Sequence, residues 1–142
     1  MKRILLTAIV LLSSLLANAQ VETIAGKWQT IDDKTGELKS LVQIFKATNG
    51  KFYGKVLELY KDKDAVCSKC EGENHNKPIV GMMVVRDMVI DGDVMRGTIL
   101  DPASGKVYYA TLSLEGSSKL KVRGSLDKKG FIVRTQYWKR SK

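Results

Sequence analysis

The stretch that decides the fold runs from Val94 to Ser125 and reads VMRGTILDPASGKVYYATLSLEGSSKLKVRGS. It contains three runs rich in β-branched and aromatic residues, which favour strands, and these runs lie at 94–100, 106–114 and 119–125. The short stretches between them contain Gly, Asp, Pro and Ser, which are typical of tight turns. In the third run, apolar or small and basic residues alternate, as in a half-buried strand, with Leu120, Val122 and Gly124 on one face and Lys119, Lys121 and Arg123 on the other.

The same signature extends in both directions along the chain. Further strands are predicted at 27–31, 38–46, 52–60, 79–89 and 131–139. Short turn motifs join most of them, including Asn49-Gly50, which is a strong hairpin dipeptide. The last segment has large residues on both of its faces, so we expect both faces of that strand to be covered. One long hydrophilic connection, 61–77, interrupts the series, and a loop of this length in a compact domain is usually functional or stapled.

About eight antiparallel strands joined by hairpins must protect two sheet edges. A meander that closes on itself removes both edges, so the sequence predicts an all-β fold: one antiparallel, up-and-down barrel of about eight strands. The alternative is a sandwich of two sheets, which needs several long crossings that this sequence lacks. An eight-stranded barrel is wide enough to be filled by side chains or to hold one small ligand.

The N-terminus has the pattern of a secretory signal. Lys2 and Arg3 precede an apolar run at 4–16, and Ala17-Asn18-Ala19 is a small-x-small cleavage motif. Cleavage there exposes Gln20 and leaves a single domain at 20–142. The apolar run is short for a membrane span, which needs about 20 residues, so an uncleaved anchor is the less favoured alternative. We therefore predict a periplasmic or secreted protein with no integral membrane segment after cleavage.

The charge of the mature chain is basic but dispersed. Removal of residues 1–19 leaves 22 basic and 15 acidic residues, and hence a net charge of +7. Such a surface can attract anionic partners. However, the lysines do not form the long blocks expected of a nucleic-acid-binding tail, so a soluble surface without a nucleic-acid partner is the favoured interpretation.

The two cysteines, Cys67 and Cys70, occur as Cys-Ser-Lys-Cys in the long connection. Disulfides persist in oxidising compartments, so we predict a local disulfide that stiffens this loop. The alternatives are a redox-active pair, which usually lies at a helix N-terminus, and a zinc site with His75. A structural zinc site needs a fourth protein ligand, so no metal site is predicted.

No catalytic constellation emerges from the chain. A Ser-His-acid triad would have to use His75, the only histidine, and no nucleophile motif lies near it. Phosphate-binding and dinucleotide-binding glycine motifs are also missing from the sequence. We therefore assign no catalytic residue and no cofactor, although an enzyme that uses His75 or Arg134 for acid–base chemistry stays a minor alternative.

Several strings of the sequence together resemble the bacterial DUF2147 family over essentially the whole mature chain. They are TIDDKTGE (30–37) with Lys39-Ser40, CSKC (67–70), PIVGM (78–82), LDP (100–102) with Gly105-Lys106, KVRG (121–124) and RTQYW (134–138). The resemblance implies an exported bacterial protein with a lipocalin-like barrel. It implies no established activity and no catalytic residues.

A weaker similarity links Gly26-Lys27-Trp28 to the Gly-x-Trp motif of lipocalins. First and last strands are neighbours in a closed meander, so Trp28 would plug the closed end with Arg134 or Arg140 stacked on its ring. For Arg134 this structural role is favoured over binding an anionic head group. The sequence departs from the Arg-x-Tyr pair of fatty-acid-binding relatives, because Gln136 follows Arg134 at that spacing.

The remaining candidate residues are polar or aromatic positions on the last three predicted strands. The full set for lining a pocket or closing the barrel is Trp28, Tyr108, Arg123, Arg134, Gln136 and Trp138. Our leading hypothesis is an exported protein that binds a small hydrophobic or amphipathic ligand inside the barrel. The second is a ligand-free structural or interaction module of the cell envelope that presents the Cys67–Cys70 loop to a partner.

Overall fold

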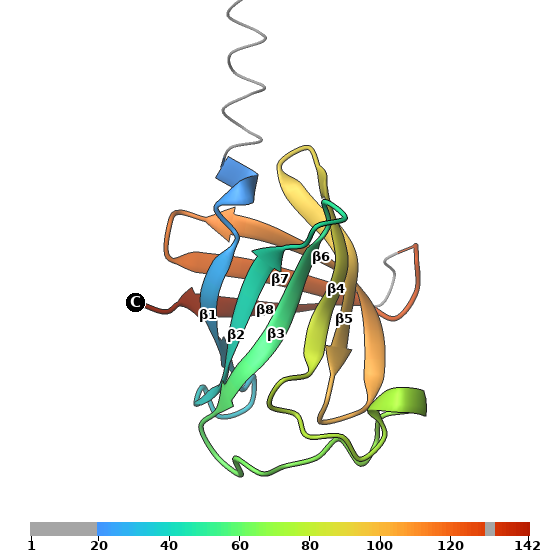
Figure 1. Ribbon diagram of the computed structural model, residues 1–142. Coiled ribbons are helices and arrows are strands. Elements are labelled where there is room, and N and C mark those ends of the chain that lie inside the picture. Colours follow the sequence, from blue (N-terminus) through green and yellow to red (C-terminus); the bar gives the residue numbers. More distant parts are fainter. Residues whose placement is uncertain (1–19, 130–132) are drawn as a thin grey trace, which may run out of the picture.

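The computed structural model describes residues 20–129 and 133–142. It contains eight strands and one short 3-10 helix, and residues 20–22 before the first strand are helical (Figure 1). The elements are β1 (Gly26–Ile31), β2 (Leu38–Lys46), β3 (Phe52–Leu59), η1 (Gly72–Asn74), β4 (Met83–Asp91), β5 (Val94–Asp101), β6 (Lys106–Glu115), β7 (Lys119–Ser125) and β8 (Val133–Arg140). The signal-like segment at 1–19 lies outside the described residues, as do positions 131–132 of the last predicted strand.

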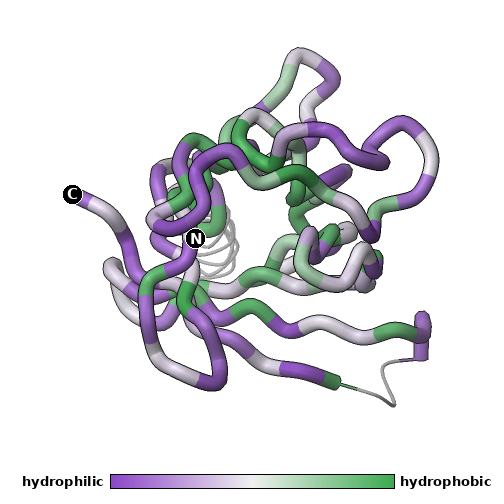
Figure 2. The backbone as a smooth tube through the Cα atoms, turned by 90° about the horizontal axis from the view of Figure 1, so that it is seen from below, coloured by the Kyte–Doolittle hydropathy of each residue, from purple (hydrophilic) through white to green (hydrophobic). Residues whose placement is uncertain are grey.

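The strands form a closed antiparallel barrel in sequence order, β1 to β8. Figure 2 shows this ring from below, with the β7–β8 hairpin running along one side. The barrel closes where Trp28 pairs with Arg140 and Gln29 pairs with Lys139. The predicted all-β barrel is thus confirmed, and the two-sheet sandwich is excluded.

The connections divide the barrel into an open and a closed end. The β1–β2, β3–β4 and β5–β6 connections surround one end, which we call the mouth and which lies at the bottom of Figure 1. The N-terminal segment covers the opposite end, where Val21, Ile24 and Trp28 are buried. The indole N–H of Trp28 donates a hydrogen bond to the Ile24 carbonyl oxygen at 2.8 Å.

The predicted cation–π contact is made by Arg140, whose guanidinium carbon lies 4.2 Å from the centre of the Trp28 ring. Arg140 also donates to the carbonyl oxygens of Ser117 and Thr23, at 2.6 and 2.8 Å. The favoured stacking role for Arg134 was wrong. Arg134 lies near the start of β8, at the mouth, whereas Arg140 lies at its end, beside β1.

Two other expectations fail in detail. The fourth strand starts at Met83 and not at residue 79, because Gly81 adopts a φ of 93° and the Met82 N–H bonds to the Ile79 carbonyl in a turn. The outer face of β8 is not fully covered, since Tyr137 stays 38% exposed with only the Lys119 ammonium 4.4 Å from its ring centre. A barrel of one sheet has no second layer to bury that face.

Candidate functional site

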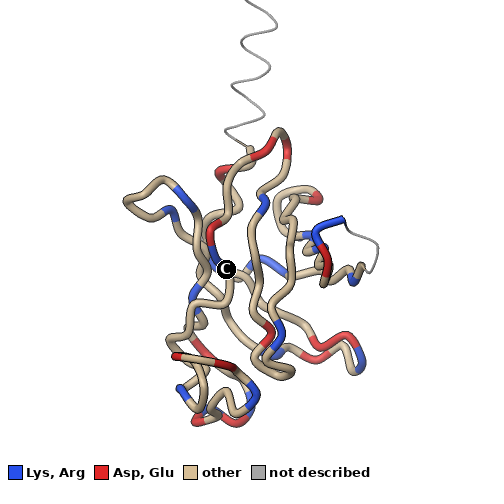
Figure 3. The backbone as a smooth tube through the Cα atoms, turned by 90° about the vertical axis from the view of Figure 1, so that its right-hand side faces the viewer, with Lys and Arg blue, Asp and Glu red and all other residues tan. Residues whose placement is uncertain are grey.

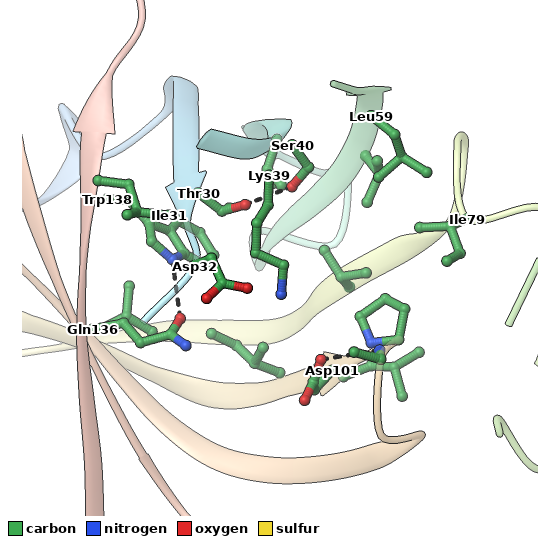
Figure 4. Close-up of a pocket in the computed structure, with 18 of the residues that line it drawn as sticks. Thr30, Ile31, Asp32, Lys39, Ser40, Leu59, Ile79, Asp101, Gln136 and Trp138 are labelled. Carbon is green, nitrogen blue, oxygen red and sulfur yellow. Dashed lines mark hydrogen bonds between the residues drawn. The ribbon is translucent and has the colours of Figure 1, made fainter. Parts of the chain in front are cut away.

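A cavity of about 450 Å³ lies inside the barrel and opens at the mouth (Figure 4). All eight strands contribute residues to its lining, together with the β1–β2, β3–β4 and β5–β6 connections. Side chains alternate between the two faces of a strand, so every strand sends part of its residues inward. The barrel interior is therefore not filled by its own side chains at this end.

The inner part of the cavity wall is apolar. It is formed by buried residues in the middle of the strands, namely Val42, Val56, Val84, Leu100, Ala110, Val122 and Trp138. The neighbour of Ala110 on β7 is Gly124, which also lines the cavity, so these two positions add little side-chain volume to the wall. The surface can accommodate an apolar group that is taken out of water, which is favourable in proportion to the area buried.

The outer part of the cavity is polar and contains two ion pairs. Lys61 donates to Glu37 at 2.6 Å, and the hydrogen bond and charge of Glu37 raise the pKa of Lys61. Arg134 pairs with Asp33 of the β1–β2 turn, and this contact raises the pKa of the guanidinium. Gln136 also donates to Asp33, at 3.0 Å. The two basic groups are thus already neutralised by neighbouring carboxylates.

A β-bulge places Lys39 at the cavity. Thr30 pairs with Ser40 and Ile31 pairs with Leu38, so Lys39 has no partner residue on β1. A bulge of this kind redirects side chains, and the three consecutive residues of β2 from Leu38 to Ser40 all line the cavity. Figure 4 shows the Lys39 ammonium and the Asp32 carboxylate both directed into the cavity. Simple alternation would have sent Lys39 to the outside.

Asp32 is fixed by the turn that follows β1. One of its carboxylate oxygens, Oδ1, accepts the backbone N–H groups of Lys34 and Thr35 at 2.8 and 3.1 Å. These hydrogen bonds lower the pKa of the Asp32 carboxyl. Desolvation opposes them, and the charge of Lys39 and the Thr35 side chain lower the pKa further. Asp32 is therefore a carboxylate at neutral pH, and the turn N–H groups contact its Oδ1 atom.

The disulfide predicted between Cys67 and Cys70 is present, and both residues are buried. Its loop packs against the β5–β6 turn, where Cys67 Sγ lies 3.4 Å from the Pro102 carbonyl oxygen. His75 Nδ1 lies within hydrogen-bond distance, 3.0 Å, of the Cys70 carbonyl oxygen. The loop supplies Ala65 and Ile79 to the cavity lining, so the disulfide braces one side of the mouth. It also removes the thiolates that the zinc alternative would have required.

The six candidate residues occupy three different places. Tyr108, Arg134, Gln136 and Trp138 line the cavity. Trp28 lies at the closed end, and Arg123 is exposed and outside the lining. Sequence analysis missed Asp32 and Lys39 as cavity residues, although the turn chemistry around Asp32 was visible, because a bulge leaves no mark in an alternating pattern.

Residues 20–129 and 133–142 contain no group of three or more His, Cys, Asp and Glu side chains arranged to hold a metal ion. None of the described helices has the length and hydropathy of a membrane-spanning segment. Basic and acidic residues are interspersed over strands and loops, as Figure 3 shows.

Comparison with known proteins supports the architecture. A solved structure titled "Protein HP1028 from the human pathogen Helicobacter pylori belongs to the lipocalin family" superposes with a TM-score of 0.72. The two sequences are 24% identical, and the match covers 83% of this chain and 82% of that chain, so the likeness concerns the fold. No curated protein gives a significant match. Residues 26–140 match the family model described as "Uncharacterized protein conserved in bacteria (DUF2147)", and the chain therefore belongs to the DUF2147 family.

Proposed function

We propose that this protein binds a small, partly apolar ligand inside its barrel. The observation that carries the proposal is the open cavity of about 450 Å³ with an apolar inner wall and polar groups at its mouth. Binding sites for small molecules are typically concave, mostly apolar and supplied with a few polar groups, with volumes of roughly 300 to 1,000 Å³. The cavity has each of these properties.

The hypothesis of a ligand-free envelope module receives less support from the same observation. A scaffold has no need of an open interior, and tight packing of the barrel would be the more stable arrangement. The disulfide of the long loop is buried against the β5–β6 turn and contributes to the cavity mouth. Its position favours a role in shaping the binding site over presentation of the disulfide to a partner.

Filling the cavity is expected to weaken ligand binding without unfolding the protein. Ala110→Phe places a ring in the space beside Gly124, so affinity for the apolar fluorescent probe N-phenyl-1-naphthylamine should fall at least about tenfold, the cost of losing most of a buried apolar contact. Probe fluorescence during titration provides the measurement. Thr111→Phe, on the outer face of the same strand, is the matched control and should bind like the wild type.

Extraction of the protein from its native source, followed by mass spectrometry, would identify a copurifying ligand. The proposal fails if neither copurifying molecule nor probe binding is found in protein whose circular dichroism spectrum is that of a folded β-barrel. It also fails if Ala110→Phe binds the probe as well as the control, because the probe would then occupy another site.

The location outside the cytoplasm is part of the proposal, and residues 1–19 and the disulfide are what support it. We expect the mature protein, isolated from cells that express the full chain, to begin at Gln20 when its N-terminus is sequenced. Ala19→Arg should block cleavage, because signal peptidase requires a small residue there. A cytoplasmic protein that retains Met1 would contradict this prediction.

A further inference from the structure

The charged groups of the cavity fall into two classes: those already paired and those available to a ligand. Lys61 is paired with Glu37, and Arg134 is paired with Asp33. Asp101 is occupied by its own turn, since it accepts the Ala103 N–H at 3.1 Å and the Ser104 hydroxyl at 2.9 Å. These contacts hold the mouth loops in place and leave few free donors or acceptors.

Lys39 and Asp32 stay available to a ligand, as does Asp62, a lining carboxylate whose charge acts on Lys61. Within residues 20–129 and 133–142, the Lys39 ammonium makes no ion pair or hydrogen bond, although it lines the cavity and is directed into it (Figure 4). The two backbone N–H groups that bind Asp32 both contact its Oδ1 atom. One unpaired cation and the Asp32 carboxylate therefore face the same opening, above an apolar wall.

This arrangement discriminates between head groups by charge. A purely anionic group would meet Lys39 but also the carboxylates of Asp32 and Asp101, and the lining holds four carboxylates against three cations. A purely cationic group would meet Asp32 but also the unpaired Lys39. A head group with one charge of each sign satisfies both residues and is repelled by neither.

We propose that the ligand is a single-chain amphiphile with a zwitterionic head group, held by Lys39 and Asp32 at the mouth while its chain lies against the apolar wall. The inference rests on the proposed function and adds the chemical class of the ligand. A single chain fits because about 450 Å³ lies near the small end of ligand-site volumes.

Four probes with the same dodecyl-length chain test the head group. They are dodecylphosphocholine (zwitterionic), dodecanoate (anionic), dodecyltrimethylammonium (cationic) and triethylene glycol monododecyl ether (neutral), each titrated below its micelle concentration by calorimetry. We expect dodecylphosphocholine to bind about fivefold more tightly than each of the others, which is the size expected of partly exposed charge contacts. The advantage should shrink in high salt, because exposed charges are screened.

Two variants assign the preference to its residues. Lys39→Met should remove the advantage of the zwitterion over the cationic probe, and Asp32→Asn should remove its advantage over the anionic probe. Asn keeps an oxygen acceptor for the turn N–H groups, so the β1–β2 connection is preserved. Lys55→Met is the matched control: it removes the same charge from an exposed position outside the cavity lining and should leave the preference unchanged.

The outcomes separate this inference from the proposed function. Equal binding of all four probes, or tightest binding of a singly charged one, overturns the zwitterion assignment while ligand binding stands. A preference that survives both variants, in protein that still binds N-phenyl-1-naphthylamine, overturns the roles of Lys39 and Asp32. If no probe binds at all, the proposed function falls and this inference falls with it.

Discussion

Replacement of Trp28 with alanine is expected to lower the free energy of unfolding by about 4 kcal/mol, as for other large aromatic residues removed from a core. The indole is fully buried, stacks against Arg140 and donates a hydrogen bond to Ile24. Its loss leaves a void at the closed end and separates the N-terminal segment from β8. Urea denaturation followed by far-UV circular dichroism would measure the change.

Two further variants separate the contributions of the indole ring, its N–H group and the Arg140 contacts to the free energy of unfolding. Trp28→Phe keeps most of the apolar volume but loses the indole N–H, so its cost should be smaller. Arg140→Met removes the cation–π contact and the two hydrogen bonds to Ser117 and Thr23. A Trp28→Ala protein as stable as the wild type would show that the closed end is not packed as described.

Gly105→Ala is expected to cost about 3 kcal/mol, which is large for the addition of one methyl group. Gly105 has a φ of 73°, and a Cβ there would lie 2.0 Å from the Lys69 carbonyl oxygen. Backbone atoms of the disulfide loop occupy that space, so the loop or the β5–β6 turn must move. The loss of unfolding free energy can be measured by urea denaturation under non-reducing conditions.

Gly92→Ala is the matched control for this substitution. Gly92 has a similar φ of 65°, but nothing lies within 4 Å of its added Cβ. It should therefore show the backbone strain alone, about 1 kcal/mol. If both variants lost the same stability, the proposed contact between the disulfide loop and the β5–β6 turn would be refuted.

The barrel could be predicted from the sequence because its determinants are local. Turn residues such as Asn49-Gly50 and Asp101-Pro102 lie between segments whose alternation is clear, and hairpins between consecutive strands leave few ways to arrange the sheet. Six of the strands, β1 to β3 and β5 to β7, accordingly begin within one residue of their predicted positions. The Cys67–Cys70 disulfide could also be predicted from the sequence, since the spacing of the cysteines and the expected compartment favoured it.

The details of the site could not be predicted from the sequence, because they depend on contacts between distant parts of the chain. Arg134 finds Asp33, which is 101 positions away in the sequence, and no local pattern indicates this pairing. Lys39 reaches the cavity through a bulge that shifts the register of β1 against β2. The start of β4 was misplaced because Ile79 and Val80 are typical of strands, whereas the turn at Gly81 determines the conformation.

The seam between β1 and β8 has a mechanical consequence. Only two residue pairs join these strands, whereas seven join β7 to β8, and toward the mouth the gap is bridged by the side chains of Arg134, Gln136 and Asp33. A barrel whose first and last strands paired along their whole length could widen only by breaking backbone hydrogen bonds. Because β1 and β8 pair only near the closed end, they can separate at the mouth without breaking that pairing. A ligand wider than the cavity mouth would therefore enter where β1 and β8 separate. Amide hydrogen exchange in the unpaired parts of these two strands would then be faster than in the paired strands β7 and β8.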